Sequence, residues 1–237
     1  PGNALRTLVR VPALADRVFP FMRYIANDST LSSRHRAILI LRTAWLTQNA
    51  NLWATHASQA TESGLTEEDV LRVAEGPNDG WDEFKASLVG LVDELFRNSS
   101  ITDVTWEILS ERYDAHNLID AVMTVGDTTA AGILFNSLGI QPNDLATAQI
   151  PTNDVGYTVV VPDQEGPLTT PRIEPTDGDG LRVSRTFSRH PAMVEARSQN
   201  PGYVLNPERS RLTPHDRELL ILRMGWNAQA VYEWAKH

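Results

Sequence analysis

The sequence has no cysteine among its 237 residues. This absence excludes disulfide bonds, thiolate metal ligands, and any cysteine nucleophile or redox pair. Long apolar runs are missing as well, since the longest are AILIL at 37–41 and LLIL at 219–222. A membrane-spanning helix needs about 20 mostly apolar residues, so no such helix and no membrane partner are expected.

Basic residues are few relative to acidic ones: 21 Lys and Arg stand against 30 Asp and Glu, which gives a formal charge of -9. Nucleic acids and acidic membrane surfaces are bound through clustered Lys and Arg, so no nucleic-acid partner is expected. The first residues lack a basic segment followed by an apolar core, and a cytoplasmic location is the expectation. An apolar content of 41% suffices for one large domain or two small ones.

An internal repeat is the most informative feature of the chain. Residues 31–56 (LSSRHRAILILRTAWLTQNANLWATH) align without a gap on residues 212–237 (LTPHDRELLILRMGWNAQAVYEWAKH), and 11 of the 26 positions are identical. The identical pairs include Arg36 with Arg217, Arg42 with Arg223, Trp45 with Trp226, Trp53 with Trp234 and His56 with His237. A repeat of this kind predicts two units built on one plan.

The two copies differ at positions where acid–base chemistry would require particular residues. The second copy has Glu218 and Glu233 where the first has Ala37 and Leu52. The first unit is therefore expected to have a degenerate site and to act as a structural partner of the second. Because the pattern of the first copy continues to about residue 139, the second unit, which stops at 237, is expected to be incomplete in this sequence.

The apolar spacing predicts an all-α fold. Five or six helices are expected between residues 32 and 139. They run from Ser32 or Ser33 to about 47, from about 50 to Gly64, over a short stretch after Thr66, and at 81–97, about 102–113 and about 115–137, with Gly139 closing the last. Asn78-Asp79-Gly80 is expected to form a turn. We divide the chain into a first unit at 1–140, an extended linker at 141–183 and the start of a second unit at 184–237.

The linker is rich in proline, and its GYTVVV segment at 156–161 has the composition of a β-strand, so a short hairpin is expected there. Helical character returns near Pro191, where HPAMVEAR resembles VPALADR at 11–17. The segment TPHD at 213–216 combines a cap, a proline at the first helical position and an acidic residue, which together predict a helix start.

Glu218, Glu233 and His237 are the candidate catalytic residues. If a helix covers the last residues, Glu233 and His237 lie four apart on one face and can touch. A carboxylate bonded to imidazole fixes the tautomer and raises the basicity of the ring, which suits proton transfer near neutral pH. Glu218 on the preceding helix could complete a relay. The alternative is a solvated helix end with no chemistry.

Two other sets of repeated residues favour packing over catalysis. The twinned tryptophans are more typical of core or interface anchors than of pocket walls. Arg42 and Arg223 follow an apolar run in both copies, which favours a buried ion pair at each. His35 and His116 have no partner at a suitable spacing and are given no role.

The segment RELLILRMGW followed by YEWAKH resembles the carboxymuconolactone decarboxylase and alkylhydroperoxidase D-like family. HASQATESGLTEEDVLRVAEG at 56–76 and the stretch from 91 to 140 continue the resemblance in the first copy. The resemblance implies an AhpD-like helical bundle, here duplicated in tandem. It also implies assembly into homo-trimers or homo-hexamers, in which a separate fragment or chain could complete the second unit.

The peroxidase branch of this family uses a glutamate, a C-x-x-C pair and a histidine. By the resemblance, Glu218 takes the place of the relay glutamate, while Ala230 and Glu233 stand where the cysteines would be. The first copy has Ala37, Asn49, Leu52 and His56 at the corresponding places. Since the thiolate is the peroxide-reducing nucleophile, thiol peroxidase activity is not expected.

The cysteine-free branch removes CO2 from a carboxylated γ-lactone without a cofactor. By the resemblance, His237 is the acid–base group, Glu233 its partner and Glu218 the orienting residue, with Tyr232 and Trp234 as substrate-binding residues. The expected function is a lyase or isomerase acting on a small carboxylated lactone or related carbonyl compound. Two alternatives stay open: a Glu/Glu/His metal-dependent enzyme, and a non-catalytic oligomeric scaffold or binding protein.

Overall fold

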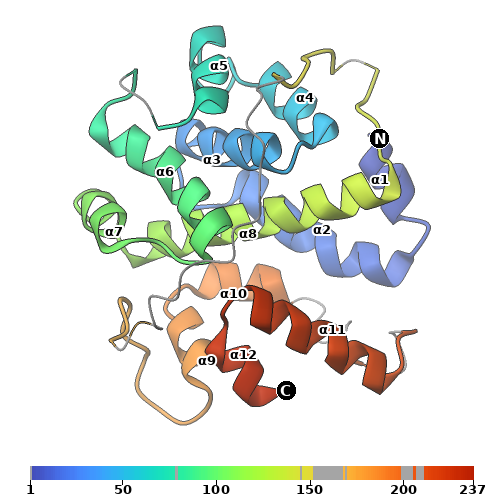
Figure 1. Cartoon of the computed structure of the whole chain (residues 1–237), viewed down its shortest axis with the longest axis vertical. Coiled ribbons are helices and arrows are strands. Elements are labelled where there is room, and N and C mark those ends of the chain that lie inside the picture. Colours follow the sequence, from blue (N-terminus) through green and yellow to red (C-terminus); the bar gives the residue numbers. More distant parts are fainter. Residues whose placement is uncertain are drawn as a thin grey trace.

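A computed structural model describes residues 2–77, 80–144, 146–151, 168, 170–198, 205–206 and 211–237. These residues contain twelve helices and no strand, which confirms the all-α prediction (Figure 1). The helices are α1 (Asn3–Leu8), α2 (Pro12–Asn27), α3 (Ser33–Leu46), α4 (Ala50–Ser58), α5 (Glu67–Glu75), α6 (Glu83–Asn98), α7 (Asp103–Ser110), α8 (Ala115–Leu138), α9 (Arg182–Phe187), α10 (Pro191–Ser198), α11 (Pro214–Asn227) and α12 (Val231–Lys236).

Helix α3 is the centre of the main core. Its first turn is capped by Ser32, whose side chain accepts a hydrogen bond from the backbone N–H of His35. Every residue from 37 to 46 is buried, and α3 packs against α4, α5, α6 and α8. A helix whose apolar residues lie on all sides must be covered by other helices on all sides, so the sequence of α3 accounts for its central position.

Helix α8 is the longest helix and lies along α3. Asp114 caps its start, and Gly139 ends it in the left-handed conformation at φ 65°. By length and composition α8 could cross a membrane, although polar residues interrupt its apolar stretches. Half of its most apolar window is buried inside the protein, as in the core helix of a helical bundle.

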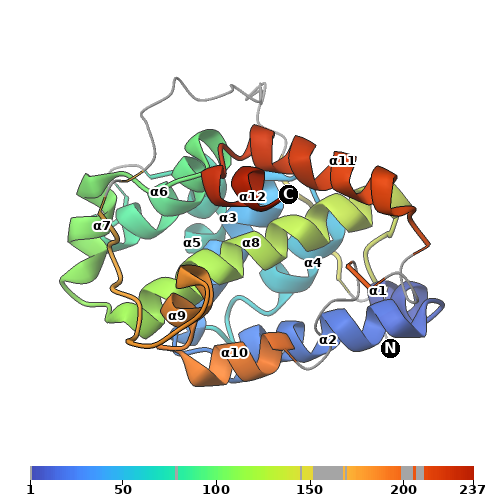
Figure 2. The ribbon, with the colours of Figure 1, turned by 90° about the horizontal axis from the view of Figure 1, so that it is seen from below.

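The amino-terminal helices α1 and α2 were not predicted. Helix α2 begins at Pro12, a position that proline favours because the missing N–H has no intrahelical partner there. Its apolar face packs against α10 (Figure 2), and Phe21, Ile25 and Met193 belong to a second, smaller core between these helices. The sequence likeness between VPALADR and HPAMVEAR therefore falls on two helices that touch each other.

Several predicted boundaries shift. Helix α4 ends at Ser58 and turns fill the chain up to Gly64, while α6 begins at Glu83 and α7 spans only Asp103–Ser110. The predicted hairpin at 156–161 lies outside the described residues, as do Asn78 and Asp79 of the predicted turn. The starts at Ser33, Pro191 and Pro214 are confirmed.

The repeated segments have the same local structure. In each, the helix pair α3–α4 or α11–α12 is joined through a glutamine with positive φ, 50° at Gln48 and 51° at Gln229. Each glutamine side chain donates a hydrogen bond to the carbonyl of the tryptophan three residues earlier. The caps also correspond, since Thr213 accepts from the N–H of Asp216 as Ser32 does from His35.

The surroundings of the two helix pairs differ. Trp45 and Trp53 are 4% and 1% exposed, whereas their counterparts Trp226 and Trp234 are 54% and 51% exposed. Figure 1 shows α11 and α12 outside the body formed by α3 to α8, on the same side as α9 and α10. The core role considered for the tryptophans is therefore confirmed for Trp45 and Trp53, and an interface role for Trp226 and Trp234 stays a prediction.

The repeated arginines divide in the same way. Arg42 is buried and forms a two-pronged ion pair with Asp93, with Nε–Oδ1 at 2.7 Å and Nη2–Oδ2 at 2.9 Å. Its remaining nitrogen donates to the carbonyls of Val73 and Ala74 at the end of α5. Arg223 is exposed and pairs with none of the described residues, so the ion pair predicted for it is wrong.

Candidate functional site

The structure brings together the three residues predicted to carry out proton transfer. Nδ1 of His237 lies 2.8 Å from Oε2 of Glu218, which is hydrogen-bonding distance. Nε2 of the same ring lies 3.8 Å from Oε2 of Glu233. The two ring nitrogens of His237 therefore face two different carboxylates.

The short connection between α11 and α12 produces this arrangement. It folds the two helices back on each other, so the first turn of α11 and the last turn of α12 meet. Gly225 faces Glu233 across the helix pair, and a Cβ built at this position would lie 3.5 Å from Cβ of Glu233, which is an ordinary van der Waals contact. The separation of 19 residues between Glu218 and His237 is thus closed by packing of the two helices.

A cation lies next to this trio. Nε of Arg217 is 3.7 Å from Oε1 of Glu218, and the arginine side chain is only 11% exposed. Two of its nitrogens, Nε and Nη1, are buried without a hydrogen-bond partner. A buried guanidinium with unused donors is costly unless an anion approaches it, so this corner favours a negatively charged ligand.

The predicted substrate-binding residues are on α12 but outside the trio. Trp234 packs edge-on against Trp226, with ring centroids 5.7 Å apart, and Tyr232 is partly exposed. Within the described parts of the chain, no group of three His, Asp or Glu side chains is placed to hold a metal ion. The Glu/Glu/His metal site considered from the sequence therefore lacks its geometry.

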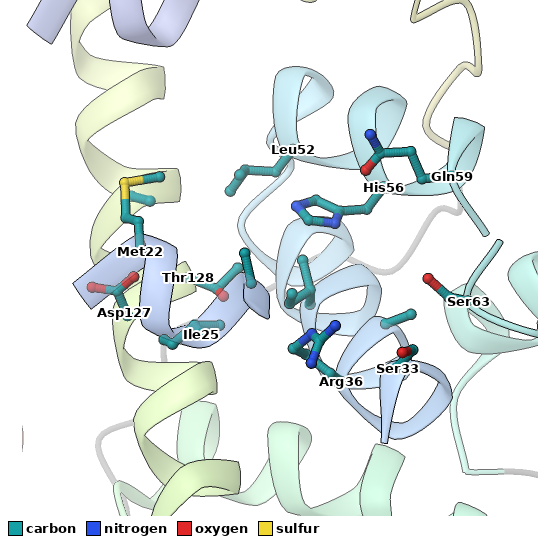
Figure 3. Close-up of a pocket in the computed structure, with 14 residues that line it drawn as sticks. Met22, Ile25, Ser33, Arg36, Leu52, His56, Gln59, Ser63, Asp127 and Thr128 are labelled. Atoms are coloured by element: carbon teal, nitrogen blue, oxygen red, sulfur yellow. The ribbon is translucent and has the colours of Figure 1, made fainter. Parts of the chain in front are cut away.

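A cavity of about 250 Å³ lies in the first unit, between α2, α3, α4 and α8. Arg36 and His56, the counterparts of Arg217 and His237, project into it from α3 and α4 (Figure 3). Met22 and Asp127 lie on the opposite wall. Its lining is completed by Ile25, Ala26, Ser33, Ala37, Ile40, Leu52, Gln59, Ser63, Thr128 and Ala131.

Two groups in this cavity have shifted pKa values. Burial and the nearby charge of Arg36 lower the pKa of His56 to about 4, so its ring is neutral at pH 7. Burial raises the pKa of Asp127 to about 6, although Arg197 and Arg17 oppose this shift. The cavity therefore contains one permanent cation, a neutral imidazole and a carboxyl group that titrates near neutrality.

Comparison with protein families assigns the first part of the chain. Residues 12–88 match the model of the carboxymuconolactone decarboxylase family. This region is therefore similar to that family. No curated protein and no solved structure matches the chain.

The match relates residues 12–88 to the superfamily that also contains the AhpD proteins, and it agrees with the all-α fold. The matched region includes α2, α3, α4 and most of the cavity lining, with Arg36 and His56. Glu218, Glu233 and His237 lie outside it. The second unit thus depends on the internal repeat alone.

Sequence reasoning found His56 but missed this cavity. Asp127 lies on α8, about 70 residues after His56. No sequence motif contains both residues, so their proximity could not be predicted. The recurrence of Arg36 and His56 as Arg217 and His237 was the available indication, since both members of each pair are identical between the copies.

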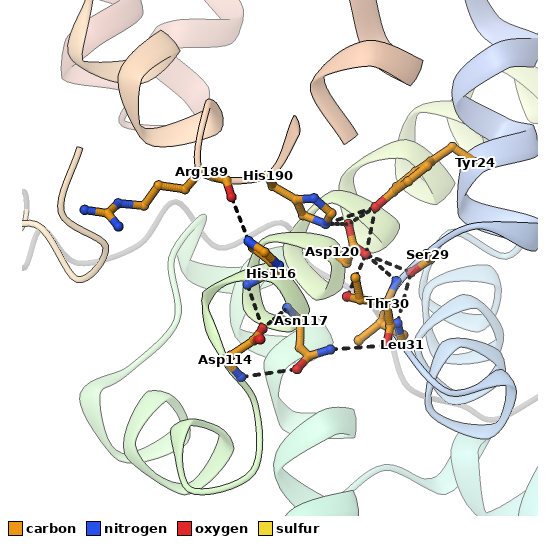
Figure 4. A network of polar contacts seen from close by, with 10 residues as sticks. All are labelled: Tyr24, Ser29, Thr30, Leu31, Asp114, His116, Asn117, Asp120, Arg189 and His190. Atoms are coloured by element: carbon orange, nitrogen blue, oxygen red, sulfur yellow. Dashed lines mark hydrogen bonds and ion pairs between the residues drawn. The ribbon is translucent and has the colours of Figure 1, made fainter. Parts of the chain in front are cut away.

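A second histidine–carboxylate contact links the residue before α10 to α8 (Figure 4). Nε2 of His190 lies 3.1 Å from Oδ1 of Asp120, and the hydroxyl of Tyr24 contacts both. The other oxygen of Asp120 accepts hydrogen bonds from Ser29 and from the backbone and hydroxyl of Thr30. Asp120 and His190 are buried, so this network holds the helices together from within the protein.

Proposed function

We propose that the protein is a cofactor-independent lyase or isomerase that acts on a small carboxylated lactone or related carbonyl compound. The observation that carries the proposal is the 2.8 Å contact between His237 and Glu218 with Glu233 on the other side of the ring. The similarity of residues 12–88 to the carboxymuconolactone decarboxylase family supports the reaction class.

In the proposed reaction, Glu218 accepts the hydrogen bond of Nδ1–H and so directs the chemistry to Nε2 of His237. Loss of CO2 breaks the bond between the carboxylate and the ring carbon, and the electron pair remains in a dienolate. Nε2–H of the histidine then gives its proton to one carbon of the dienolate. Glu233, 3.8 Å from Nε2, restores the proton from solvent.

Arg217 supports an anionic reaction path. A guanidinium with free donors beside the acid–base pair can bind the oxygen on which charge develops when the dienolate forms. Because the donors are already in place and partly shielded from water, their effect on a developing charge is larger than at an exposed surface. An isomerisation through an enolate would use the same three groups without release of CO2.

The test follows 4-carboxymuconolactone and a panel of carboxylated lactones and β-keto acids by proton NMR in D2O. Release of CO2 with deuterium at one carbon is expected for the wild type, or deuterium exchange without CO2 for an isomerase. His237→Ala should lower the rate by about 10² to 10⁴, the range of general acid–base catalysis. His215→Ala, an exposed histidine on the same helix pair, is the matched control. Equal rates in both variants would refute the role of His237.

A non-catalytic assembly role is the second candidate, and the exposed apolar surface of α11 and α12 favours it. This surface consists of Leu219, Leu220, Met224, Trp226, Val231 and Trp234. Exposed apolar patches of this kind are typical of interfaces between subunits. In that case light scattering would detect a homo-oligomer that Leu220→Glu dissociates, and Glu218→Gln would leave every measured property unchanged.

A further inference from the structure

The first unit, expected from its sequence to be only a structural partner, contains the features of a binding site. Its cavity lies between four helices and is open to solvent on one side, and apolar side chains such as Met22, Ile40 and Leu52 form much of the wall. Arg36 and His56 are the polar groups that project from α3 and α4 (Figure 3). Apolar walls with a few convergent polar groups are typical of sites for small organic molecules.

Arg36 has no counter-ion. Within the described chain its guanidinium makes neither an ion pair nor a hydrogen bond, although burial is enough to lower its pKa. Arg42 on the same helix is different, because its guanidinium forms an ion pair with Asp93 and donates hydrogen bonds to two backbone carbonyls. The contrast indicates that the partner of Arg36 comes from outside the chain.

The two copies share the residues that could bind an anion but differ in the carboxylates that proton transfer would need. Both copies keep the arginine and the histidine, but Ala37 and Leu52 replace the carboxylates that contact His237 in the second copy. Without a carboxylate on either ring nitrogen, His56 lacks the partner that would make it a good base. The first site is therefore equipped to hold an anion without moving its protons.

We propose that the cavity of the first unit binds the carboxylate group of a small monocarboxylic acid between Arg36 and His56 and does not convert the ligand. The guanidinium donates to the carboxylate oxygens, and the neutral imidazole donates one further hydrogen bond through its N–H. The apolar wall of α2 and α4 covers the hydrocarbon part. This site is independent of the proton transfer proposed at His237.

Two features limit the ligand. The cavity volume of about 250 Å³ is below the range of about 300–1,000 Å³ that is usual for drug-sized ligands, so a single ring or a short chain fits best. Asp127 lies on the wall opposite Arg36 and would repel a second carboxylate on the far side of the ligand. Monocarboxylates should therefore bind better than dicarboxylates of the same size.

The test uses isothermal titration calorimetry with benzoate, its neutral isostere benzamide, and the dicarboxylate terephthalate, on the full chain. Histidine ring signals are followed by NMR, with His56 assigned through His56→Gln. Arg36→Gln removes the charge, and Ala131→Leu fills the cavity while Arg36 stays in place. Arg217→Gln is the matched control, because it makes the same change in the other copy. Circular dichroism melting checks that each variant is folded.

Benzoate is expected to bind and to move the ring signals of His56, with benzamide and terephthalate weaker. Arg36→Gln and Ala131→Leu should each weaken benzoate at least about tenfold, since hydrogen bonds to charged groups contribute this much. Arg217→Gln should leave the His56 response unchanged. The proposal is overturned if benzoate leaves the His56 signals in place, or if folded Arg36→Gln binds it as tightly as the wild type. Since no activity is measured, the result is separate from the test of His237.

Discussion

Removing one partner of the Arg42–Asp93 pair should destabilise the protein strongly. Both side chains are less than a tenth exposed, and the guanidinium is held at 2.7 Å and 2.9 Å by the two carboxylate oxygens. Asp93→Asn leaves the charge of Arg42 buried and uncompensated, which costs about 3–5 kcal/mol. With a total stability of about 5–15 kcal/mol for a typical domain, this loss moves the unfolding midpoint far to lower denaturant.

The repeat provides the matched control for this experiment. Arg223 occupies the position of Arg42 in the second copy, but it is exposed and unpaired within the described chain. Arg223→Gln should therefore change the free energy of unfolding by no more than about 0.5 kcal/mol. Urea unfolding followed by circular dichroism measures both variants, and similar losses for Asp93→Asn and Arg223→Gln would refute the reasoning from burial.

Four further predictions concern groups inside the first unit. Because the pKa of His56 is lowered to about 4, the unfolded chain protonates this histidine at a higher pH than the folded chain does. The free energy of unfolding should therefore fall as the pH drops from 6.5 towards 4, and urea unfolding of His56→Gln should show a smaller decrease over this range. Because the pKa of Asp127 is raised to about 6, the folded chain takes up this proton first. Asp127→Asn should therefore be more stable than the wild type at pH 7, with the gap closing towards pH 4. Asp120→Ala should cost about 1–3 kcal/mol, since it takes the acceptor from the buried hydroxyl of Tyr24 and from the partly buried donors of Thr30, and a drop within 0.5 kcal/mol in urea would contradict this. Gly132→Ala would place a Cβ 2.8 Å from Oγ1 of Thr47 and should lower the melting temperature, which Thr47→Ala should restore in part.

The sequence predicted those helices whose ends have chemical markers. Thr66 and Asp114 lie just before α5 and α8, and Gly139 ends α8, so these boundaries are close to the predicted ones. Helix α2 was missed because Pro20 interrupts its interior, where proline normally breaks a helix. Its packing against α8 and α10 stabilises it in spite of this proline.

The candidate site in the second copy could be found from the sequence because its residues are close in the chain. Spacing of four places Glu233 beside His237, and the repeat indicated Glu218. The cavity of the first unit depends instead on α2 and α8 reaching the α3–α4 pair from about 10 residues before and 70 residues after it. Contacts of this length leave no pattern in one sequence, so Asp127 could not be assigned to His56.

The two copies separate what a segment determines by itself from what its neighbours determine. Both form the same turn around a glutamine with positive φ, so 26 residues suffice to specify the helix pair. The burial of a side chain depends on the rest of the fold instead. Trp45 is buried and Trp226 is exposed, although the sequences on either side of them are similar. Burial lowers the pKa of His56 to about 4, whereas His237 lies at the surface between two carboxylates. The same arginine and histidine therefore have different surroundings in the two copies, which is the reason why we propose anion binding for one pair and proton transfer for the other.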